Sequence, residues 1–164
     1  MYECPPGKTC PSSRPFCLAV GPGAGLQLSA SNRFHPNRIM FAGHHGAYEY
    51  DVIWYSDDGG QTYTVAKNNT GNGETAKIWK QDEVALAEGN NGEVFISTRN
   101  EAYHKGYPDD PAITCNCRGV SRSLDGGSTF GPSVPAPVLV GPVCQATMLS
   151  VTNDTGNKSQ IKKK

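Results

Sequence analysis

The sequence has no net charge, no long apolar run and no amphipathic helix pattern of useful length. It contains 15 basic and 15 acidic residues among its 164 positions, so no overall field attracts nucleic acid or an acidic membrane surface. No apolar run is long enough to span a membrane, and none near Met1 is long enough for a signal peptide. These absences argue against a membrane-spanning or nucleic-acid-binding protein and against a helical bundle.

Turn-forming residues are abundant instead. The chain has 19 glycines, 12 prolines and 37% apolar residues, and it is long enough for one domain with a core. Short apolar runs between turn signals predict strands at 26–31, 38–42, 52–56, 62–65, 82–88, 93–100 and 143–151. The sequence therefore predicts an all-β fold, for which a β-propeller is the best architecture and a β-sandwich the alternative.

Two octapeptides share the pattern Ser-x-Asp-Gly-Gly-x-Thr-aromatic: Ser56–Tyr63 and Ser123–Phe130. The Gly-Gly pair tolerates positive φ, and Asp58 and Asp125 can fold their carboxylates back onto turn amides. Each octapeptide thus predicts a tight hairpin turn, and the repeat indicates propeller blades or a solenoid. The residues expected to be structural are Ser56, Asp58, Gly60, Thr62, Ser123, Asp125, Gly127 and Thr129.

The six cysteines are compatible with disulfides formed outside the cytoplasm, in a pairing that the sequence leaves open. Three Asn-x-Ser/Thr sequons are also compatible with a secreted or lysosomal protein. Cys115 and Cys117, taken with His44 and His45, lack the ligand spacing of a zinc site, so we expect no metal. The cysteines are Cys4, Cys10, Cys17, Cys115, Cys117 and Cys144.

Two further patterns have structural explanations. The glycines at 21–25 are spaced like a phosphate-binding loop, but residues 26–31 alternate like a strand instead of opening a helix, so we expect no dinucleotide cofactor. The acid pairs at 57–58 and 109–110 resemble the paired carboxylates of ordinary glycosidases. One pair lies in a predicted turn and the other beside prolines, so we interpret both as structural or solvated.

The order of these motifs resembles that of the exo-α-sialidases, which are six-bladed β-propellers. The two octapeptides resemble Asp boxes, the BNR repeats of sialidase blades. Gly21–Leu28 resembles the family's Gly-Pro-Gly-x-Gly-Ile/Leu-Gln segment, and residues 144–146 resemble its Cys-Gln-Gly segment. Between them, Glu83, Glu88, Gly92 and residues 97–100 resemble its Glu-x-Gln-x-x-Glu, glycine turn and Asn-x-Arg-Asn. The resemblance covers roughly residues 20–150.

This resemblance implies a glycoside hydrolase, a retaining exo-α-sialidase that releases terminal sialic acids from glycoproteins, glycolipids and oligosaccharides without a cofactor. Arg99 matches the middle one of three arginines that bind the sialate carboxylate. Glu83 matches the glutamate that accepts the proton of a tyrosine nucleophile, a departure from the usual pair of carboxylates. His44, His45 and Gln145 are implied to contact the glycerol or N-acyl groups.

Each assignment has a simpler alternative. Glu83 could be a solvated charge at a strand edge, and Arg99 could form a surface ion pair with Asp82 or Glu101, worth about 0–1 kcal/mol. The chain also departs from the family, because Ala85 replaces the usual glutamine and Ser97 the usual asparagine.

The family's Phe/Tyr-Arg-Ile-Pro segment, its other two arginines, its acid–base aspartate and its nucleophilic tyrosine match no residue here. We therefore expect a partial propeller of about three of the six blades at 20–152, after an irregular segment at 1–19 and before a disordered basic tail at 153–164. The remaining blades would come from the rest of the parent chain, and this chain alone would be inactive. A non-catalytic Asp-box module that binds glycans or proteins is the alternative.

Overall fold

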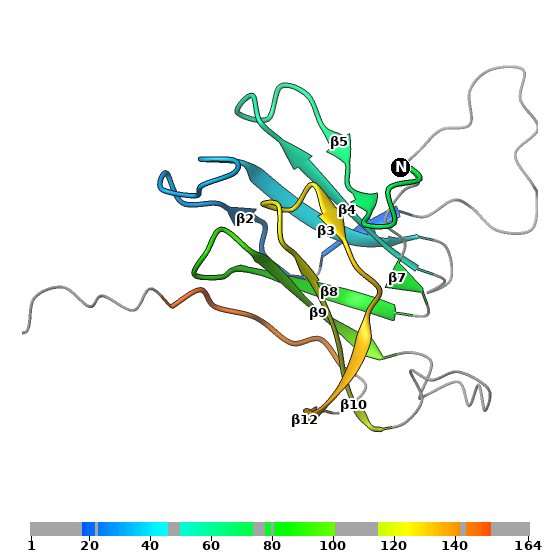
Figure 1. Ribbon diagram of the computed structural model, residues 1–164. Helices are drawn as coiled ribbons and strands as arrows, with labels where there is room; N and C mark the ends of the chain where they lie inside the picture. Colours follow the sequence, from blue (N-terminus) through cyan, green and yellow to red (C-terminus); the bar gives the residue numbers. More distant parts are fainter. Residues whose placement is uncertain are drawn as a thin grey trace, which may run out of the picture.

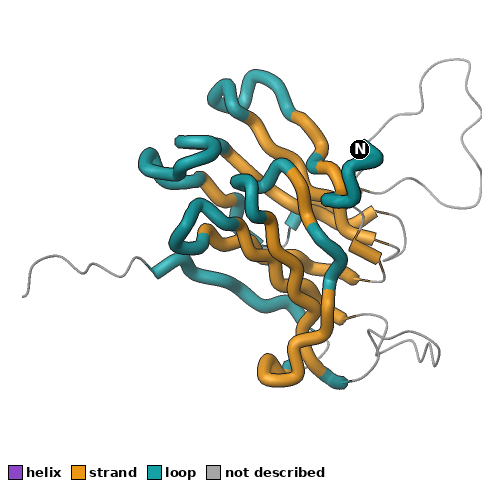
Figure 2. Tube along the Cα trace, viewed as in Figure 1, coloured by secondary structure: helices purple, strands orange, loops and turns teal. Residues whose placement is uncertain are grey.

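The computed structural model describes residues 18–21, 23–45, 50–73, 78–79, 81–100, 115–141 and 144–151. Strands are the only regular secondary structure in these ranges, which contain no helix (Figure 2). This result confirms the predicted all-β class. The predicted tail at 153–164, and the predicted irregular segment up to residue 17, lie outside the described residues.

The strands form two main antiparallel sheets and one short parallel pair (Figure 1). The first sheet has the order β1-β3-β4-β5, with β2 pairing with β3 and β7 with β4. The second has the order β12-β10-β9-β8, and β6 pairs with β11 in parallel. The first sheet consists of β1 (Leu18–Val20), β2 (Leu26–Gln27), β3 (Ile39–His45), β4 (Tyr50–Ser56), β5 (Thr64–Val65) and β7 (Ile78–Trp79). The other strands are β6 (Lys67–Asn68), β8 (Gln81–Glu88), β9 (Val94–Asn100), β10 (Cys117–Ser123), β11 (Thr129–Phe130) and β12 (Val134–Val140).

The hydrophobic core lies between the two sheets, where β3 packs against β8. Both sheets contribute to it because alternate residues of each strand point to the same face. Phe130, which ends the second octapeptide, is 1% exposed and joins this core. The buried members are Leu28, Met40, Ala42, Ile53, Ala66, Val84, Leu86, Val94, Ile96 and Phe130.

The two octapeptides form the same hydrogen-bonded turn. In the first, the Ser56 hydroxyl donates to Asp58 Oδ1 at 2.7 Å and accepts from the Gly60 amide at 2.8 Å, while the Thr62 amide and hydroxyl donate to the Asp58 carboxylate. The second octapeptide repeats these four bonds at matching positions, from Ser123 to Thr129. The predicted folding of both aspartates onto turn amides is therefore confirmed.

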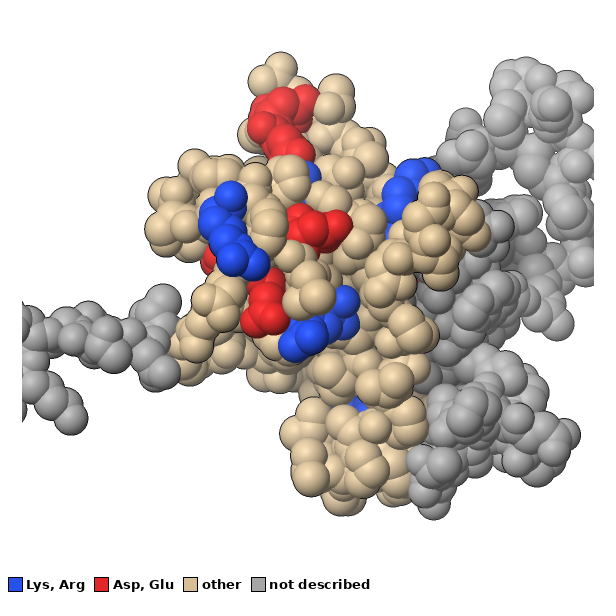
Figure 3. Space-filling model, viewed as in Figure 1, with Lys and Arg blue, Asp and Glu red and all other residues tan. Residues whose placement is uncertain are grey.

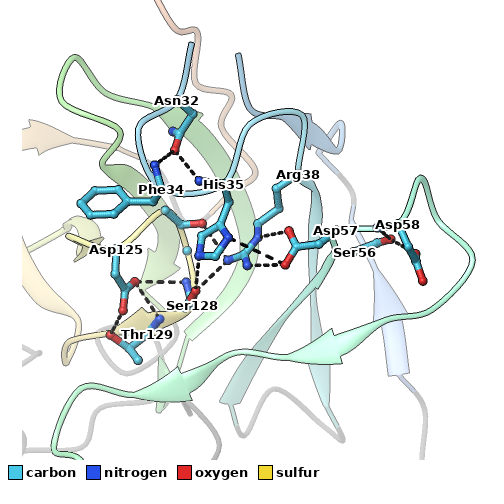
Figure 4. A network of polar contacts seen from close by, with 12 residues as sticks. Asn32, Phe34, His35, Arg38, Ser56, Asp57, Asp58, Asp125, Ser128 and Thr129 are labelled. Carbon is cyan, nitrogen blue, oxygen red and sulfur yellow. Dashed lines mark hydrogen bonds and ion pairs between the residues drawn. The ribbon is translucent and has the colours of Figure 1, made fainter. Parts of the chain in front are cut away.

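Arg38 connects the two octapeptides (Figure 4). Its guanidinium donates to both oxygens of Asp57, at 2.7 and 2.6 Å, in the first octapeptide. It also donates to the Gly126 carbonyl at 3.0 Å and to the Ser128 hydroxyl at 2.8 Å in the second. The guanidinium lies over the Tyr55 ring, 3.8 Å from its centroid, and the residue is 1% exposed. One buried arginine thus ties the turn of one sheet to the turn of the other.

Three sequence-based strand predictions need correction. The last strand is β12 at Val134–Val140, and residues 144–151 form no strand, so the prediction of 143–151 is wrong. Pro135 and Pro137 argue against a strand in the sequence, but β12 lies at the sheet edge, where a missing amide donor is tolerated. The strand predicted at 26–31 ends at Gln27, before a turn at 30–31. Conversely, β1 starts at Leu18, inside the segment predicted to be irregular.

Candidate functional site

Three of the predicted site residues meet where strands of the two sheets end. His44 lies near the end of β3, Glu83 near the start of β8 and Arg99 near the end of β9. Their side chains are 17%, 22% and 20% exposed, so each is partly buried and still reaches the surface. Beneath them lies Asp82, whose side chain is 1% exposed. The sequence predicted the first three residues and treated the fourth only as a surface charge.

A β-bulge places Glu83 beside Arg99. The register of β8 with β9 runs from Asp82 opposite Arg99 to Ala85 opposite Ser97, with an irregularity between them. Glu83 has a φ of 47°, a left-handed conformation that a non-glycine residue rarely adopts. Bulges of this kind redirect side chains and are common beside active sites. Here Glu83 Oε2 lies 3.1 Å from the Arg99 NH1 atom.

Asp82 contacts all three neighbours. Its Oδ1 atom lies 2.8 Å from His44 Nδ1 and accepts a hydrogen bond from the Glu83 amide at 2.8 Å. Its Oδ2 atom lies 3.3 Å from Arg99 NH1. Burial raises the pKa of Asp82, while the charges of His44 and Arg99 and the Glu83 amide oppose that rise. The ion pair of Arg99 with Asp82, which the sequence suggested as a simpler alternative, is present but lies mostly below the surface.

Asp51 is a second buried carboxylate at this site. It lies directly opposite His44 in the pairing of β3 with β4, so the two side chains share one face of the sheet. The residue is 0% exposed, and neither carboxylate oxygen has a hydrogen-bond partner among the described residues. Burial, followed by the negative charge of Asp82, raises the pKa of Asp51 well above its usual value, while Arg118 opposes the shift.

Arg118, in β10, completes the set of charged residues and is 6% exposed. It donates to the Ser97 hydroxyl at 3.1 Å and to the Cys144 carbonyl at 2.7 Å. A longer bond, at 3.4 Å, reaches the Glu83 carbonyl in the bulge. Burial lowers the pKa of Arg118, and the nearby charge of Arg99 acts in the same direction. Arg118 therefore connects β10 to the bulge in β8 and to the segment that begins at Cys144.

The remaining predicted substrate residues have different positions. His45 is the last residue of β3, and the position of its side chain lies outside the described part of the structure. Gln145 is exposed and lines a groove of ≈ 660 Å³ together with Ser97, Arg118 and Val140. Glu83, Arg99 and His44 do not line that groove. The structure thus brings His44 together with Glu83 and Arg99, and it places Gln145 in the lining of this groove.

Within the described ranges, no three His, Cys, Asp or Glu side chains are grouped to hold a metal ion. Cys115 and Cys117 form a disulfide, and Cys144 has an exposed free thiol.

The described residues include no helix long and apolar enough to cross a membrane. On the face in Figure 3, acidic and basic side chains lie beside one another, and no large area carries one sign.

No protein-family profile and no curated protein sequence matches the chain. Solved sialidase structures do resemble its fold. A NanB sialidase from Streptococcus pneumoniae superposes with a TM-score of 0.56 and 20% identity, covering 80% of this chain and 17% of that one. An intramolecular trans-sialidase from leech gives a TM-score of 0.50 and 24% identity, covering 72% of this chain and 14% of that one. The intramolecular trans-sialidase from Ruminococcus gnavus gives a TM-score of 0.50 and 23% identity, covering 73% of this chain and 20% of that one.

At these identities the likeness concerns the fold. The chain spans at most 20% of the length of these three sialidases, so it corresponds to a part of each. The predicted fold class is confirmed: the chain has an all-β fold that matches part of a sialidase-type β-propeller.

Proposed function

We propose that this chain supplies part of the active site of a retaining exo-α-sialidase, which releases terminal sialic acids from glycoproteins, glycolipids and oligosaccharides. The proposal rests on the ion pair of Glu83 with Arg99, in which Oε2 and NH1 lie 3.1 Å apart. Glu83 lies in the bulge of β8, and Arg99 lies near the end of β9. The sialidase-type fold around this pair supports the same assignment.

The chemistry of a terminal sialic acid fits this pair. Its anomeric carbon carries a carboxylate, which the Arg99 guanidinium binds by charge-assisted hydrogen bonds. An anionic nucleophile would be repelled by that carboxylate, and sialidases use a tyrosine instead. Glu83 then acts as the general base that accepts the tyrosine proton. The proposal assigns no residue of this chain as that tyrosine.

The other predicted residues take supporting roles in this proposal. His44, His45 and Gln145 contact the glycerol or N-acyl groups of the sugar. The two octapeptides serve as structural Asp boxes, which set the register of the blades and do not touch substrate. Their hydrogen bonds, repeated atom for atom, support a purely structural role.

Two assays test the proposal on the 164-residue chain. We expect the chain to retain sialosides on a glycan array and to show no turnover of a fluorogenic sialoside, because binding cannot replace the nucleophile. Arg99→Ala should abolish sialoside binding. Arg122→Ala is the matched control, since the Arg122 side chain is 52% exposed and forms a surface ion pair with Glu93 at 3.5 Å. Turnover by this chain, or sialoside binding that survives Arg99→Ala, contradicts the proposal.

One observation favours a non-catalytic binding module as the second candidate. Asp82 and Glu83 both lie within ion-pair distance of Arg99, and their charges compete with a ligand carboxylate for the guanidinium. A module of this kind would bind other glycans or a protein. Its array pattern would not depend on Arg99, so the same experiment separates the two candidates.

A further inference from the structure

All the polar contacts of the Asp82 carboxylate lead to candidate site residues, and they join it to three of them. Oδ1 faces His44 Nδ1 at 2.8 Å and accepts the Glu83 amide at 2.8 Å, and Oδ2 faces Arg99 NH1 at 3.3 Å. These partners come from three strands that belong to both sheets. One carboxylate therefore connects the imidazole, the bulge and the guanidinium.

Burying a carboxylate is unfavourable unless charged or hydrogen-bonding partners compensate it. Asp82, whose side chain is 1% exposed, meets that condition only while its neighbours keep their positions. The same contacts act in the other direction: the carboxylate restrains each neighbour. In particular, its bond to the Glu83 amide holds the bulge in which Glu83 has a φ of 47°.

Glu88, at the other end of β8, provides a comparison. Its carboxylate accepts hydrogen bonds from the Ser29 amide at 2.7 Å, the Ser29 hydroxyl at 2.9 Å and the Asn32 side chain at 2.8 Å. These partners belong to one loop and include none of the candidate site residues. Two carboxylates on the same strand thus have similar numbers of contacts but different partners, and only Asp82 contacts the site.

We propose that Asp82 is a positioning residue that fixes His44, the Glu83 bulge and Arg99 in the arrangement that receives an anionic sugar. The inference rests on the proposed function for the identity of that ligand, but not for the contacts themselves. The proposal requires the neutral His44 ring to carry its proton on Nδ1, the nitrogen that lies 2.8 Å from the Asp82 carboxylate. Arg99 is held at NH1, on the side of the buried carboxylates.

The charged and titratable groups that surround Asp82 come from every neighbouring strand. His44 lies on β3, Asp51 on β4, Glu83 on β8 itself, Arg99 on β9 and Arg118 on β10. Two of these groups, His44 and Arg99, contact the carboxylate directly and draw it toward the site. Asp51 and Glu83 also carry carboxyl groups, so Asp82 keeps its position only with His44 and Arg99 in place.

The first test needs neither a variant nor a ligand. Long-range ¹⁵N–¹H spectra of the wild-type chain, with the His44 ring assigned, report which nitrogen carries the proton in the neutral imidazole. We expect the Nδ1–H form. A neutral ring protonated on Nε2 overturns the proposal, because His44 Nδ1 would then have no hydrogen to donate to the Asp82 carboxylate.

The second test compares Asp82→Asn with Glu88→Gln, which makes the same chemical change on the same strand. We expect Asp82→Asn to shift the His44 ring signals and the Arg99 Nε–H signal, while Glu88→Gln leaves both unchanged. A purely structural role of Asp82 would alter thermal stability but not the His44 tautomer. Unchanged His44 and Arg99 signals in folded Asp82→Asn overturn the proposal.

Titration with N-acetylneuraminic acid connects this inference to the proposed function. We expect Asp82→Asn to raise the Kd about tenfold, the effect of weakening one charge-assisted contact, and Glu88→Gln to leave it unchanged. A wild-type chain that does not bind the sugar contradicts the proposed function, while the ring spectra still decide the role of Asp82. Equal Kd values for wild type and Asp82→Asn overturn the positioning role.

Discussion

Asp51 is held in an environment that disfavours its charge. It is 0% exposed, has no hydrogen bond to either oxygen within the part of the chain that the structure describes, and lies near the carboxylate of Asp82. An unsatisfied buried polar group costs stability, and natural proteins retain such groups mostly at functional sites. The position of Asp51 opposite His44 therefore links it to the candidate site rather than to the core.

The raised pKa of Asp51 predicts a pH dependence of stability. Between the unfolded and folded pKa values the folded state keeps the proton and the unfolded state releases it, so the wild type loses stability as the pH rises. Asparagine does not titrate. We expect the free energy of unfolding of Asp51→Asn, relative to wild type, to increase from about pH 4 upward. Chemical denaturation at several pH values measures this difference.

Asp125 provides a control of opposite sign. Burial acts to raise its pKa, but hydrogen bonds from Thr129, Ser123 and Ser128 outweigh it and lower that pKa. The wild type should therefore be more stable than Asp125→Asn above about pH 4 and lose that advantage as the pH falls through the folded pKa. If the difference in free energy of unfolding between Asp51→Asn and wild type does not change with pH, the raised pKa of Asp51 is contradicted.

At this scale the sequence predicted some site residues and missed others for a physical reason. Glu83 and Arg99 were predicted through the resemblance to sialidases, whose motif has the same order of residues and a turn between them. The roles of Asp51, Asp82 and Arg118 depend on the packing of β3 against β8 and on hydrogen bonds across β9 and β10. A charge at a strand end looks solvated in the sequence, and only the packing of the sheets buries it.

At the scale of elements, the two octapeptide turns share their hydrogen bonds but differ in what surrounds them. Gly60 and Gly127 occupy matching positions, with φ angles of 91° and 85°. A Cβ atom on Gly60 would meet the hydroxyl of Tyr63 at 3.0 Å, at the end of a side chain that is 48% exposed. A Cβ atom on Gly127 would collide with the side chain of Met40, which is 0% exposed in the core.

This difference predicts unequal effects of the same substitution. Gly60→Ala should lower the free energy of unfolding by about 1–2 kcal/mol, the cost of a left-handed alanine. Gly127→Ala should cost about 1–3 kcal/mol more, because the core must also accommodate the new methyl group. Denaturation in guanidinium chloride compares the two variants. Equal losses of stability would show that the second turn does not pack on Met40.

The Arg38 network predicts that one side chain stabilises both sheets. Arg38→Ala removes the bonds to Asp57, Gly126 and Ser128 and leaves a cavity, so we expect a loss of about 2–4 kcal/mol. Arg33→Ala is the control, since Arg33 is exposed and lies over the Phe34 ring, and should change stability by less than about 0.5 kcal/mol. Similar, small effects of both substitutions would contradict a stabilising role of the Arg38 network.

Among the elements, the β8–β9 hairpin and the two octapeptide turns followed from the sequence because their signals are local. The Asn-Gly turn and the Asp-Gly-Gly cores specify a backbone conformation without help from distant residues. Strand β12 did not follow, because its prolines are acceptable only at a sheet edge, and sequence does not reveal which strand lies there. The pairing of β6 with β11, far apart in sequence, was likewise not predictable.

At the scale of the whole molecule, two antiparallel sheets pack side by side (Figure 1). Their strand ends bring His44, Asp82, Glu83 and Arg99 together. The edge strand β12 exposes apolar residues, with Val138 90% and Val140 79% exposed. The likeness to sialidases covers most of this chain but only part of theirs. The fold class followed from the repeated turns, whereas the local chemistry depends on how the sheets meet.

The claim that Arg99 binds the carboxylate of a sialic acid is tested by comparing two sugars. The wild-type chain is titrated with N-acetylneuraminic acid and with its methyl ester, which has the same ring but no charge, and binding is followed by NMR. We predict that the acid binds more tightly than the ester, and that Arg99→Ala removes this preference while Arg122→Ala preserves it. Equal affinity of the wild type for acid and ester would contradict the claim.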